Sequence, residues 1–258
     1  AASMTMDISN QNKLSEFYED LKRLNIKIIR PDINKCFADF TSNGKDFLYA
    51  LGAIKNVGYE AISNVIKERN ENGKFENISD FINRVNPKDI NKLQLEGLVR
   101  AGAFDEINNN RQALFNSIPN IILKVKNNFE NKTLNQINLF DDEFKSNDDF
   151  LEKIDDWNIE NRLSKEFETL GFFISDHPLN QYKVIFNQYN IVNFDHFENE
   201  RNSLSSNIAC TVLKVQEKKT QKGNSYAIVK FSDLNNVFEL FIFSDIFELN
   251  RDNLIEGN

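Results

Sequence analysis

The chain contains little cysteine, histidine, glycine or proline, and it has no long apolar run. Cys36 and Cys210 are far apart and lack Cys-x-x-Cys spacing, which argues against a disulfide framework or a cysteine zinc site. With only His177 and His196, a histidine-based metal site or proton relay is not expected. No apolar run approaches the roughly 18–20 residues that a membrane span needs. These absences favour a protein of the reducing cytoplasm without a membrane segment.

The acidic residues are concentrated in one part of the sequence. The net charge is −8 over 258 residues, but nine acids and two lysines fall between Asp141 and Glu160. The rest of the chain is therefore close to neutral. Segment Asn207–Lys230 is positive, because it carries five lysines against Glu217 alone. Contact with DNA is thus permitted locally, although the chain as a whole is acidic.

Apolar residues at helical spacing dominate the first two thirds of the sequence. Helices are expected over residues 12–24, 61–69, 78–85, 88–101, 110–128, 150–170 and 178–188. Pro87 is expected to start the helix at 88, and Pro119 to kink the helix at 110–128. Gly73 and Gly102 are placed as C-terminal stops. Residues 130–149 are polar and acidic, and we expect them to form an exposed linker.

Two regions predict β-structure. Segments 36–41 and 46–51 flank Asn43-Gly44, a signal for a type I′ turn, and are expected to form a hairpin. From Asn207 onwards the apolar period changes to two. Antiparallel strands are therefore expected at 208–216, 226–232 and 237–243, with a short helix at 245–249. Val237, Leu240, Ile242 and the Phe residues of the last strand alternate between barrel and surface, and they are interpreted as core rather than as stacking platforms.

The stretch Ile54–Gly58, followed by a helix, is similar to the hairpin of a helix-hairpin-helix motif. Such a turn aims backbone N–H groups at a DNA phosphate, aided by the helix dipole, and it positions without reading sequence. Asn56 stands where glycine is usual, and asparagine tolerates the left-handed conformation. The alternative, a structural turn without a ligand, is equally compatible with so short a motif. The predicted duplex-binding residues are Lys55, Asn56, Val57 and Gly58.

A second hairpin is expected at Arg100–Asp105. Its turn is apolar, with Ala103 and Phe104 as packing residues, so a structural role is favoured over DNA contact.

The sequence Gln136-Ile137-Asn138-Leu139-Phe140 lies in the acidic break. It matches the Gln-x-x-Leu-Phe pattern of peptides that bind the bacterial sliding clamp. Leu139 and Phe140 are suited to an apolar cleft, while Gln136 sets the register by hydrogen bonding. An exposed Leu-Phe pair in a polar linker has no obvious folding purpose, although a loop anchored to its own core is the alternative.

The run Glu166–Leu179 (EFETLGFFISDHPL) resembles a Glu-x-Leu-Gly-Phe-x-x-Ser-x-His-Pro-Leu run of the α (polymerase) subunit of bacterial DNA polymerase III. His177 precedes Pro178 and is expected to help start the next helix, with Phe172 and Phe173 in the core. Further stretches resemble the same family in family order: AASMTMD at 1–7, LNIKIIRPDIN at 24–34, YALGAIKNVG at 49–58 and LVRAGAFD at 98–105. Several motifs in one order are far more specific than any of them alone.

The resemblance implies an internal piece of such a polymerase, mostly α with a C-terminal β part. The parts it implies are the C-terminal end of the fingers (1–50), a tandem helix-hairpin-helix region (51–129), a clamp-binding linker (130–149), a helical connector (150–200) and a partial OB-fold (201–258). As part of a DNA-directed DNA polymerase, a nucleotidyltransferase, the piece would grip duplex DNA and tether the enzyme to the clamp. The alternatives are a non-enzymatic DNA- and clamp-binding adaptor and the error-prone paralogue of the same subunit.

The resemblance also implies where chemistry is absent and which partners to expect. The metal-binding aspartates would belong to the palm, before Ala1, so we assign no catalytic or metal residue here. Magnesium is expected only in the full-length polymerase. The partners implied are DNA, the sliding clamp and other subunits of the replicative holoenzyme. OB-folds bind single strands through basic grooves and aromatics, and the candidates are Lys214, Lys218, Lys219, Lys222 and Tyr226. A solvated lysine-rich turn is the equally weighted alternative.

Overall fold

The computed structural model describes residues 1–133, 150–199, 205–220 and 223–258. These residues form two compact units, Ala1–Gly171 and Phe172–Asn258. The expected fold class is confirmed, because helices dominate and the longer strands lie in the C-terminal part. No helix among the described residues is long and apolar enough to cross a membrane.

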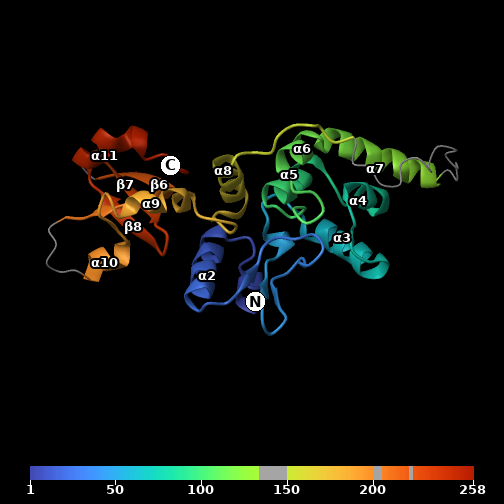
Figure 1. Ribbon diagram of the computed structural model, residues 1–258, viewed down its shortest axis with the longest axis horizontal. Helices are drawn as coiled ribbons and strands as arrows, with labels where there is room; N and C mark the ends of the chain where they lie inside the picture. Colours follow the sequence, from blue (N-terminus) through green and yellow to red (C-terminus); the bar gives the residue numbers. More distant parts are fainter. Residues whose placement is uncertain (134–149, 200–204, 221–222) are drawn as a thin grey trace. The chain divides into compact units, whose positions relative to one another are not determined.

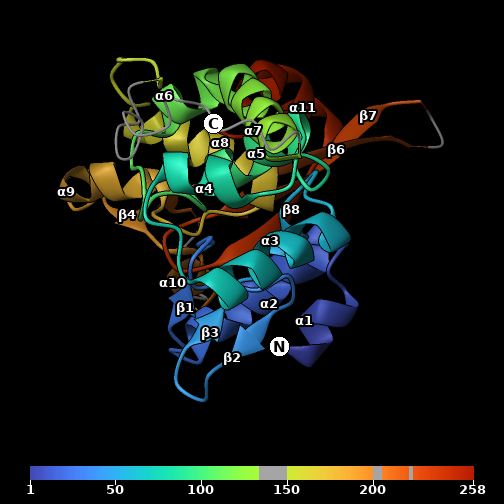
Figure 2. The ribbon, with the colours of Figure 1, turned by 90° about the vertical axis from the view of Figure 1, so that its right-hand side faces the viewer.

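The first unit is a set of helices with one small sheet. Figures 1 and 2 show α5, α6 and α7 grouped on one side of this unit and α1 and α2 on the other. Its elements are α1 (Ala2–Met6), α2 (Gln11–Arg23), β1 (Ile28–Ile29), β2 (Thr41–Ser42), β3 (Phe47–Leu48), η1 (Leu51–Ala53), α3 (Tyr59–Asn72), α4 (Ile78–Arg84), α5 (Lys92–Arg100), α6 (Arg111–Asn116), α7 (Ile118–Thr133) and α8 (Ile159–Leu170).

Asparagine side chains begin five of these helices. In each, the N-cap amide oxygen accepts a hydrogen bond from a backbone N–H of the first turn, at Asn10, Asn77, Asn91, Asn110 and Asn158. Such a cap satisfies a donor that has no partner within the helix. Two expected boundaries are corrected by these caps. Helix α5 starts at Lys92 rather than at Pro87, and α8 starts at Ile159 rather than at residue 150.

The expected helix at 110–128 is two helices. Helix α6 ends where the N–H of Ser117 donates to the carbonyl of Ala113 at 3.1 Å, and α7 begins at the next residue. Pro119 is the second residue of α7. A proline there removes an N–H that would have no intrahelical partner, so it starts this helix instead of kinking a longer one.

The small sheet has the order β1-β3-β2, with β1 parallel and β2 antiparallel to β3. The expected hairpin is therefore present, but its turn is not type I′. Of the Asn43-Gly44 pair, only Gly44 has a positive φ, at 85°. The Asn43 side chain instead accepts hydrogen bonds from the N–H groups of Lys45 and Asp46, at 3.0 and 2.7 Å. This local side-chain bonding selects a wider loop.

Edge-to-face aromatic contacts mark the core of the first unit. The rings of Phe75 and Phe81 lie 5.1 Å apart, and Phe81 and Phe104 are separated by the same distance. All three are almost fully buried, together with Leu95 and Leu98 of α5. The core therefore joins α4, α5 and the turn that follows α5, and it fixes these backbones around the hairpin at residues 54–58.

The second unit contains one antiparallel sheet, of order β6-β7-β8, and a short parallel pair β4-β5. In Figure 2, β6 and β7 project as a two-stranded ribbon. The three strands and the short helix after them confirm the expectation for this region. The elements are η3 (Pro178–Tyr182), α9 (Lys183–Phe186), β4 (Ile191–Val192), α10 (Phe194–Asn199), β5 (Asn207–Ile208), β6 (Thr211–Lys219), β7 (Ser225–Ser232), β8 (Val237–Ile242), α11 (Ser244–Asn250) and η4 (Arg251–Asn253).

His177 is a structural residue, as expected. Its Nδ1 accepts the N–H of Leu179 at 3.2 Å, which caps η3, and its Nε2 lies 3.1 Å from the Ser232 hydroxyl. The expected helix at 178–188 is in fact this 3₁₀ turn followed by the four-residue α9. Phe172 is buried, whereas Phe173 is half-buried and contacts the His177 ring at 5.5 Å.

Candidate nucleic-acid interface

The hairpin at residues 54–58 connects η1 to α3. Ile54 and Val57 are buried, while Lys55, Asn56 and Gly58 are exposed. Asn56 has φ 68°, the left-handed conformation expected of it. The apolar residues thus anchor the turn in the unit, and the polar ones face solvent.

Helix α3 begins without a side-chain cap. Its N-cap is Gly58, which has no side chain to accept a hydrogen bond. The N–H groups of a first helical turn have no intrahelical partner. They carry the positive end of the helix dipole, to which an anion is attracted. The first turn of α3 therefore presents backbone N–H groups without a side-chain cap. In α2, α4, α5, α6 and α8 an Asn side chain accepts a hydrogen bond from one of the corresponding N–H groups.

The sequence led us to expect that the backbone N–H groups of the hairpin point outward. Two of them instead form hydrogen bonds within the unit. The N–H of Lys55 donates to the carbonyl of Thr169 at 3.2 Å, and that of Val57 donates to the carbonyl of Ile54 at 3.0 Å. These two bonds hold the turn. The Lys55 side chain and the start of α3 at Gly58 remain the outward-facing groups.

Tyr59 is a candidate that the sequence reasoning missed. It is the first residue of α3 and half exposed, and its hydroxyl donates to the Asp39 carboxylate at 2.6 Å. That hydrogen bond raises the pKa of Tyr59 above its ordinary value. The sequence did show an aromatic residue directly after the Gly of the predicted hairpin. It gave no sign that Asp39, twenty residues earlier, is the hydrogen-bond partner.

The second turn, at Arg100–Asp105, is closed by an arginine. Arg111 donates to both carboxylate oxygens of Asp105, at 2.8 and 2.7 Å, and to the carbonyl of Arg100 at 3.1 Å. Burial lowers the pKa of Arg111, but the carboxylates of Asp105 and Glu166 together outweigh this effect, so the net pKa is raised. Ala103 and Phe104 are buried, as expected of packing residues.

The donors that begin α6, after this second turn, are also occupied. The Asn110 side chain accepts from the N–H of Ala113 at 2.9 Å, and Asp156 accepts from the N–H of Gln112 at 3.0 Å. The two turns therefore differ in what they offer a ligand. The turn at 54–58 leads to an uncapped helix, and the turn at 100–105 leads to a capped one.

One face of the sheet in the second unit gathers lysines and aromatics. Cross-strand neighbours share a face. Lys214 pairs with Lys230, Lys218 with Tyr226, and Ile228 with Phe241. These residues lie opposite the core face, which carries Ala227, Val229 and Phe231. Of the expected single-strand residues, Lys214, Lys218 and Tyr226 come together. Lys219 points to the other face, and Lys222 lies outside the described residues.

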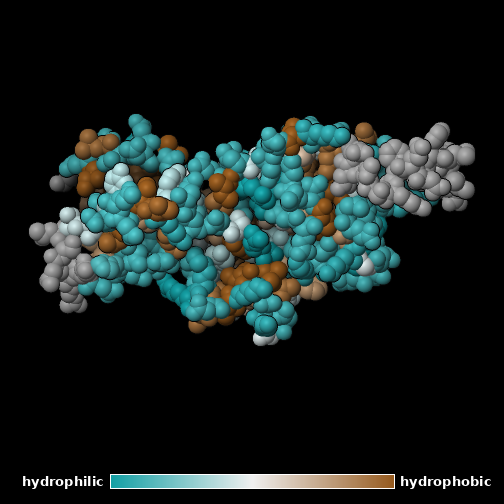
Figure 3. Space-filling view, in the orientation of Figure 1, coloured by the Kyte–Doolittle hydropathy of each residue, from teal (hydrophilic) through white to brown (hydrophobic). Residues whose placement is uncertain are grey.

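Phe241 corrects an expectation. It was interpreted as core, yet 63% of its surface is exposed, and Phe243 is 71% exposed. The strand alternates, but only one side of it is covered, by α11 through Phe247. Apolar colour also reaches the surface over α11 in Figure 3. Phe241 and Lys230 are therefore additional candidates for contact with bases and phosphates.

Glu217, the acidic residue of β6, lies on the core face of the sheet, opposite the lysines. Glu217 pairs with Ala227 of the core face and binds Arg251 through two contacts, at 2.9 and 3.1 Å. A hydrogen bond from Ser225 and the ion pair with Arg251 lower the pKa of Glu217. The face that carries Lys214, Lys218, Tyr226, Lys230 and Phe241 is called the lysine face. On it, Glu239 opposes Lys230. The lysine face is net positive.

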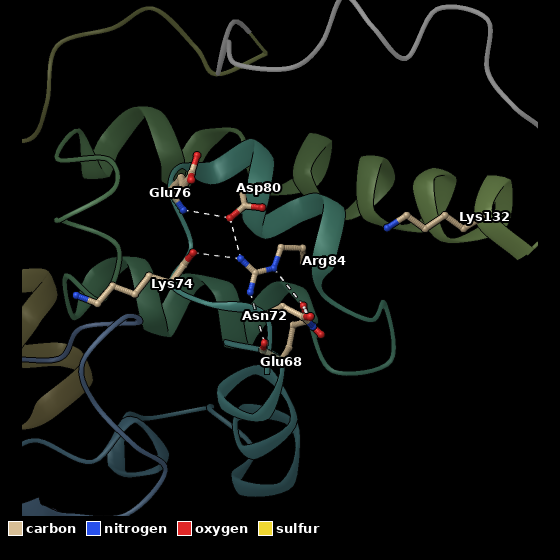
Figure 4. A pocket seen from close by; sticks show the side chains of 7 residues that line it. All are labelled: Glu68, Asn72, Lys74, Glu76, Asp80, Arg84 and Lys132. Carbon is tan, nitrogen blue, oxygen red and sulfur yellow. Dashed lines mark hydrogen bonds and ion pairs between the residues drawn. The ribbon is translucent and has the colours of Figure 1, made fainter. Parts of the chain in front are cut away.

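A polar pocket of about 580 Å³ lies between α3, α4 and α7. Arg84 occupies its centre in Figure 4, with its donors directed to Glu68 at 3.1 Å, Asp80 at 3.0 Å and the carbonyl of Gly73 at 2.7 Å. Because acids and carbonyls of the same unit engage this guanidinium, the pocket is a junction between helices. It is not the interface proposed below.

Gln136, Leu139 and Phe140, the candidate clamp peptide, lie outside the described residues. Among the residues that the structure does describe, no three His, Cys, Asp or Glu side chains are grouped to hold a metal ion.

Comparison with known proteins agrees with this geometry. A helix-hairpin-helix family model matches residues 25–114, which include both turns. DNA polymerase III subunit alpha of Caulobacter vibrioides is 32% identical over 259 residues, covering 100% of this chain and 23% of the relative. The chain is homologous to a segment of DNA polymerase III subunit alpha.

Other α subunits show the same relationship. The subunit of Borreliella burgdorferi is 32% identical, again over 100% of this chain and 23% of the relative. That of Rickettsia bellii is 34% identical, over 95% and 23%. The chain spans about a quarter of the length of these α subunits. The resemblance expected from the sequence motifs is thereby confirmed.

Proposed function

We propose that this chain acts as part of a replicative DNA-directed DNA polymerase, in which the hairpin at residues 54–58 grips duplex DNA. The observation that supports this most is the uncapped start of α3 on an exposed left-handed turn, within the stretch matched by the helix-hairpin-helix model. A phosphate oxygen would accept the free N–H donors, and the Lys55 ammonium would lie beside it.

Such a contact is independent of base sequence. It involves backbone donors, the helix dipole and one lysine, all of which recognise phosphate rather than base edges. Binding would release counterions and weaken as salt rises. This suits a polymerase part that must hold any sequence while the duplex moves past.

The test compares charge reversal at two lysines of the first unit. Lys55→Glu is expected to lower duplex affinity by about 10- to 150-fold, since a phosphate contact of this kind contributes on the order of 1.5–3 kcal/mol. Lys126→Glu, which makes the same charge change on an exposed position of α7, serves as control. Fluorescence anisotropy of a short blunt duplex over a salt series measures both. Equal losses in the two variants, or an affinity independent of salt, would reject the hairpin as the contact.

We further propose that Gln136–Phe140 tethers the polymerase to the sliding clamp. The support is the sequence pattern and its place in a polar, acidic stretch. Tethering would raise the effective concentration of the polymerase at the primer end. Leu139→Ala with Phe140→Ala should abolish binding to immobilised clamp. Ile137→Ala with Asn138→Ala, at the variable positions of the same peptide, should leave it intact. Clamp binding that survives the first pair would refute the assignment.

For the second unit, we propose that the lysine face of β6-β7-β8 contacts single-stranded DNA. Phe241 and Tyr226 would stack on bases while Lys214, Lys218 and Lys230 track phosphates. Lys218→Glu is therefore expected to weaken binding of an oligothymidine more than Lys219→Glu, which alters the opposite face. Equal effects of the two substitutions would indicate diffuse attraction rather than a binding face.

Nucleotidyl transfer itself we assign to other parts of the polymerase. Magnesium supplies charge stabilisation for the attacking and leaving oxygens in such reactions. Nothing in the hairpin or the lysine face is arranged to hold it. What these residues do is bind and orient the DNA, and we expect the other subunits of the replicative holoenzyme and the clamp to act with them.

A further inference from the structure

We propose that Gly97 of α5 and the main-chain carbonyl of Thr169 in α8 are positioning groups that hold the hairpin at 54–58 in its DNA-binding conformation. This inference rests on the function proposed above for that hairpin. It assigns a role to two residues that lie far from the motif in sequence and that touch no DNA themselves.

The peptide groups on both sides of Lys55 are fixed by these two residues. On one side, the N–H of Lys55 donates to the carbonyl of Thr169 at 3.2 Å. On the other, the Lys55 carbonyl packs on Gly97 so closely that a Cβ there would lie 2.6 Å from its oxygen. The same Cβ would lie 3.5 Å from methyl carbons of Ile54 and Val57. Helix α5 can approach the hairpin this closely only because residue 97 has no side chain.

The Thr169 carbonyl is itself held in place. It accepts a second hydrogen bond from the Gln11 side chain at 3.3 Å, while the Thr169 hydroxyl donates to the carbonyl of Lys165 at 2.8 Å. The last carbonyls of a helix have no intrahelical partner. Here the hairpin and α2 supply the partners. Helix α8 ends at the next residue, Leu170, and its C-cap Gly171 is in the left-handed conformation, φ 84°.

The consequence is a fixed direction for the donors of α3. With the Lys55 peptide held on both sides, Asn56 turns left-handed and Gly58 begins the helix. A shift of the Lys55 carbonyl would pass through this single turn to the N–H groups that meet the phosphate. Hydrogen bonds depend steeply on distance and angle, so a small displacement removes most of their strength.

Gly97→Ala in the full chain separates positioning from ordinary helix stability. Within a helix, alanine is normally more favourable than glycine. A purely structural role for Gly97 therefore predicts that only the melting temperature changes. Positioning predicts that duplex affinity falls about tenfold, the equivalent of one charge-assisted hydrogen bond. Leu93→Ala, at an exposed position of the same helix, is the matched control and should keep wild-type affinity.

A second readout keeps this proposal distinct from the function on which it rests. Backbone ¹H–¹⁵N shifts recorded without DNA should change in Gly97→Ala at residues 55–60 and stay constant in Leu93→Ala. If wild-type chain fails to bind duplex, the proposed function fails, and these shifts alone decide the positioning. Unmoved shifts, or unchanged affinity in Gly97→Ala when wild type binds, would overturn it.

If Gly97→Ala does not fold, Gly171→Asn is the alternative variant, because it alters the surroundings of the Thr169 carbonyl instead. Asparagine tolerates the left-handed conformation. Its Cβ would lie in contact with Gln11 at 3.4 Å, and the amide group beyond that Cβ would have to share space with the Gln11 side chain, the second donor to the Thr169 carbonyl. A smaller loss of duplex affinity in the same direction is expected, and full wild-type affinity in this variant would count against the proposal.

Discussion

The turn at 54–58 and the turn at 100–105 occupy similar places, each ahead of a helix, yet they end differently. The first passes through Asn56 at φ 68° and the second through Gly102 at φ 76°. After the first, α3 starts on Gly58 with its donors uncapped. After the second, Asn110 and Asp156 occupy the donors of α6, and Arg111 fills the space inside the turn.

The difference shows how one backbone shape serves two purposes. The turn proposed to bind an anion keeps its donors free and is held by neighbouring backbone at Gly97 and Thr169. A turn that only connects helices satisfies its own donors, and a buried ion pair holds it together. Resemblance of the turns in sequence therefore does not predict that both contact DNA.

The largest expected effect comes from breaking the closed turn. Arg111 is 4% exposed and lies 3.6 Å from Glu166, which is fully buried. Arg111→Met would remove this guanidinium from the buried Glu166 and leave Asp105 with Arg162, at 3.3 Å, and it should lower the free energy of unfolding by about 3–5 kcal/mol. Urea denaturation measures it. Lys67→Met, which removes an exposed pair at 3.8 Å, should change stability by less than about 0.5 kcal/mol. Similar losses in both variants would contradict the role of burial.

A smaller effect is expected from straining the open turn. Asn56→Ala places a Cβ-bearing residue without a hydrogen-bonding side chain at φ 68°, which should destabilise the chain by about 1–2 kcal/mol. Thermal unfolding is a suitable measurement. Asn187→Ala, at a residue with φ −65°, is the matched substitution and should stay within about 0.5 kcal/mol of wild type. Equal melting temperatures for the two variants would show that the left-handed turn is not strained.

Capping α3 would convert the open turn into a closed one. Gly58 has φ −72° and ψ 128°, and a Cβ there would meet only Ala61, at 3.9 Å. Gly58→Asn should stabilise the chain by a few tenths of a kcal/mol at most. Its amide would compete for the phosphate donors, so duplex affinity should fall about tenfold. Higher stability with undiminished affinity would show that these donors do not meet DNA.

The converse change on α6 is the control. Asn110→Gly removes the cap but leaves the Asp156 bond to Gln112, so no gain in duplex affinity is expected. A gain would show that an uncapped helix alone is enough.

The smallest expected effect concerns pH at the edge of the open turn. The Asp39 carboxylate raises the pKa of Tyr59 above 10.0. The raised pKa stabilises the folded state fully below the ordinary value, and this contribution is lost as pH rises through the folded value. In Asp39→Asn, phenolate absorbance should therefore appear at lower pH. Asp46→Asn, in the loop between β2 and β3, is the control. An unchanged titration in Asp39→Asn would refute the hydrogen bond as the cause.

Much of the fold was predictable from local pattern, and the exceptions share a cause. Helix α2, the strands β6, β7 and β8, and the left-handed Asn56 followed from spacing and residue type. The start of α5 did not, because Asn91 rather than Pro87 supplies the cap. Proline and asparagine both favour helix starts, and only the three-dimensional structure shows which one the chain uses.

The candidate site was predictable only in part for a different reason. Lys55 and Gly58 were identified from the motif. Gly97 and Thr169 contact the hairpin from α5 and α8, and no sequence spacing predicts contacts between residues so far apart in the chain. Phe241 was misassigned because alternation shows that a strand has two faces without showing which of them is covered.

The asparagine caps make the starts of these helices less sensitive to low pH than aspartate caps would. An aspartate cap loses its charge when protonated, whereas an amide carries the same acceptor oxygen at every pH. Five helices of the first unit start on such amides. The asparagine contribution to these helix starts should therefore survive acidification. Chemical ageing would act in reverse, because hydrolysis of one amide creates a carboxylate and makes that helix start sensitive to pH for the first time.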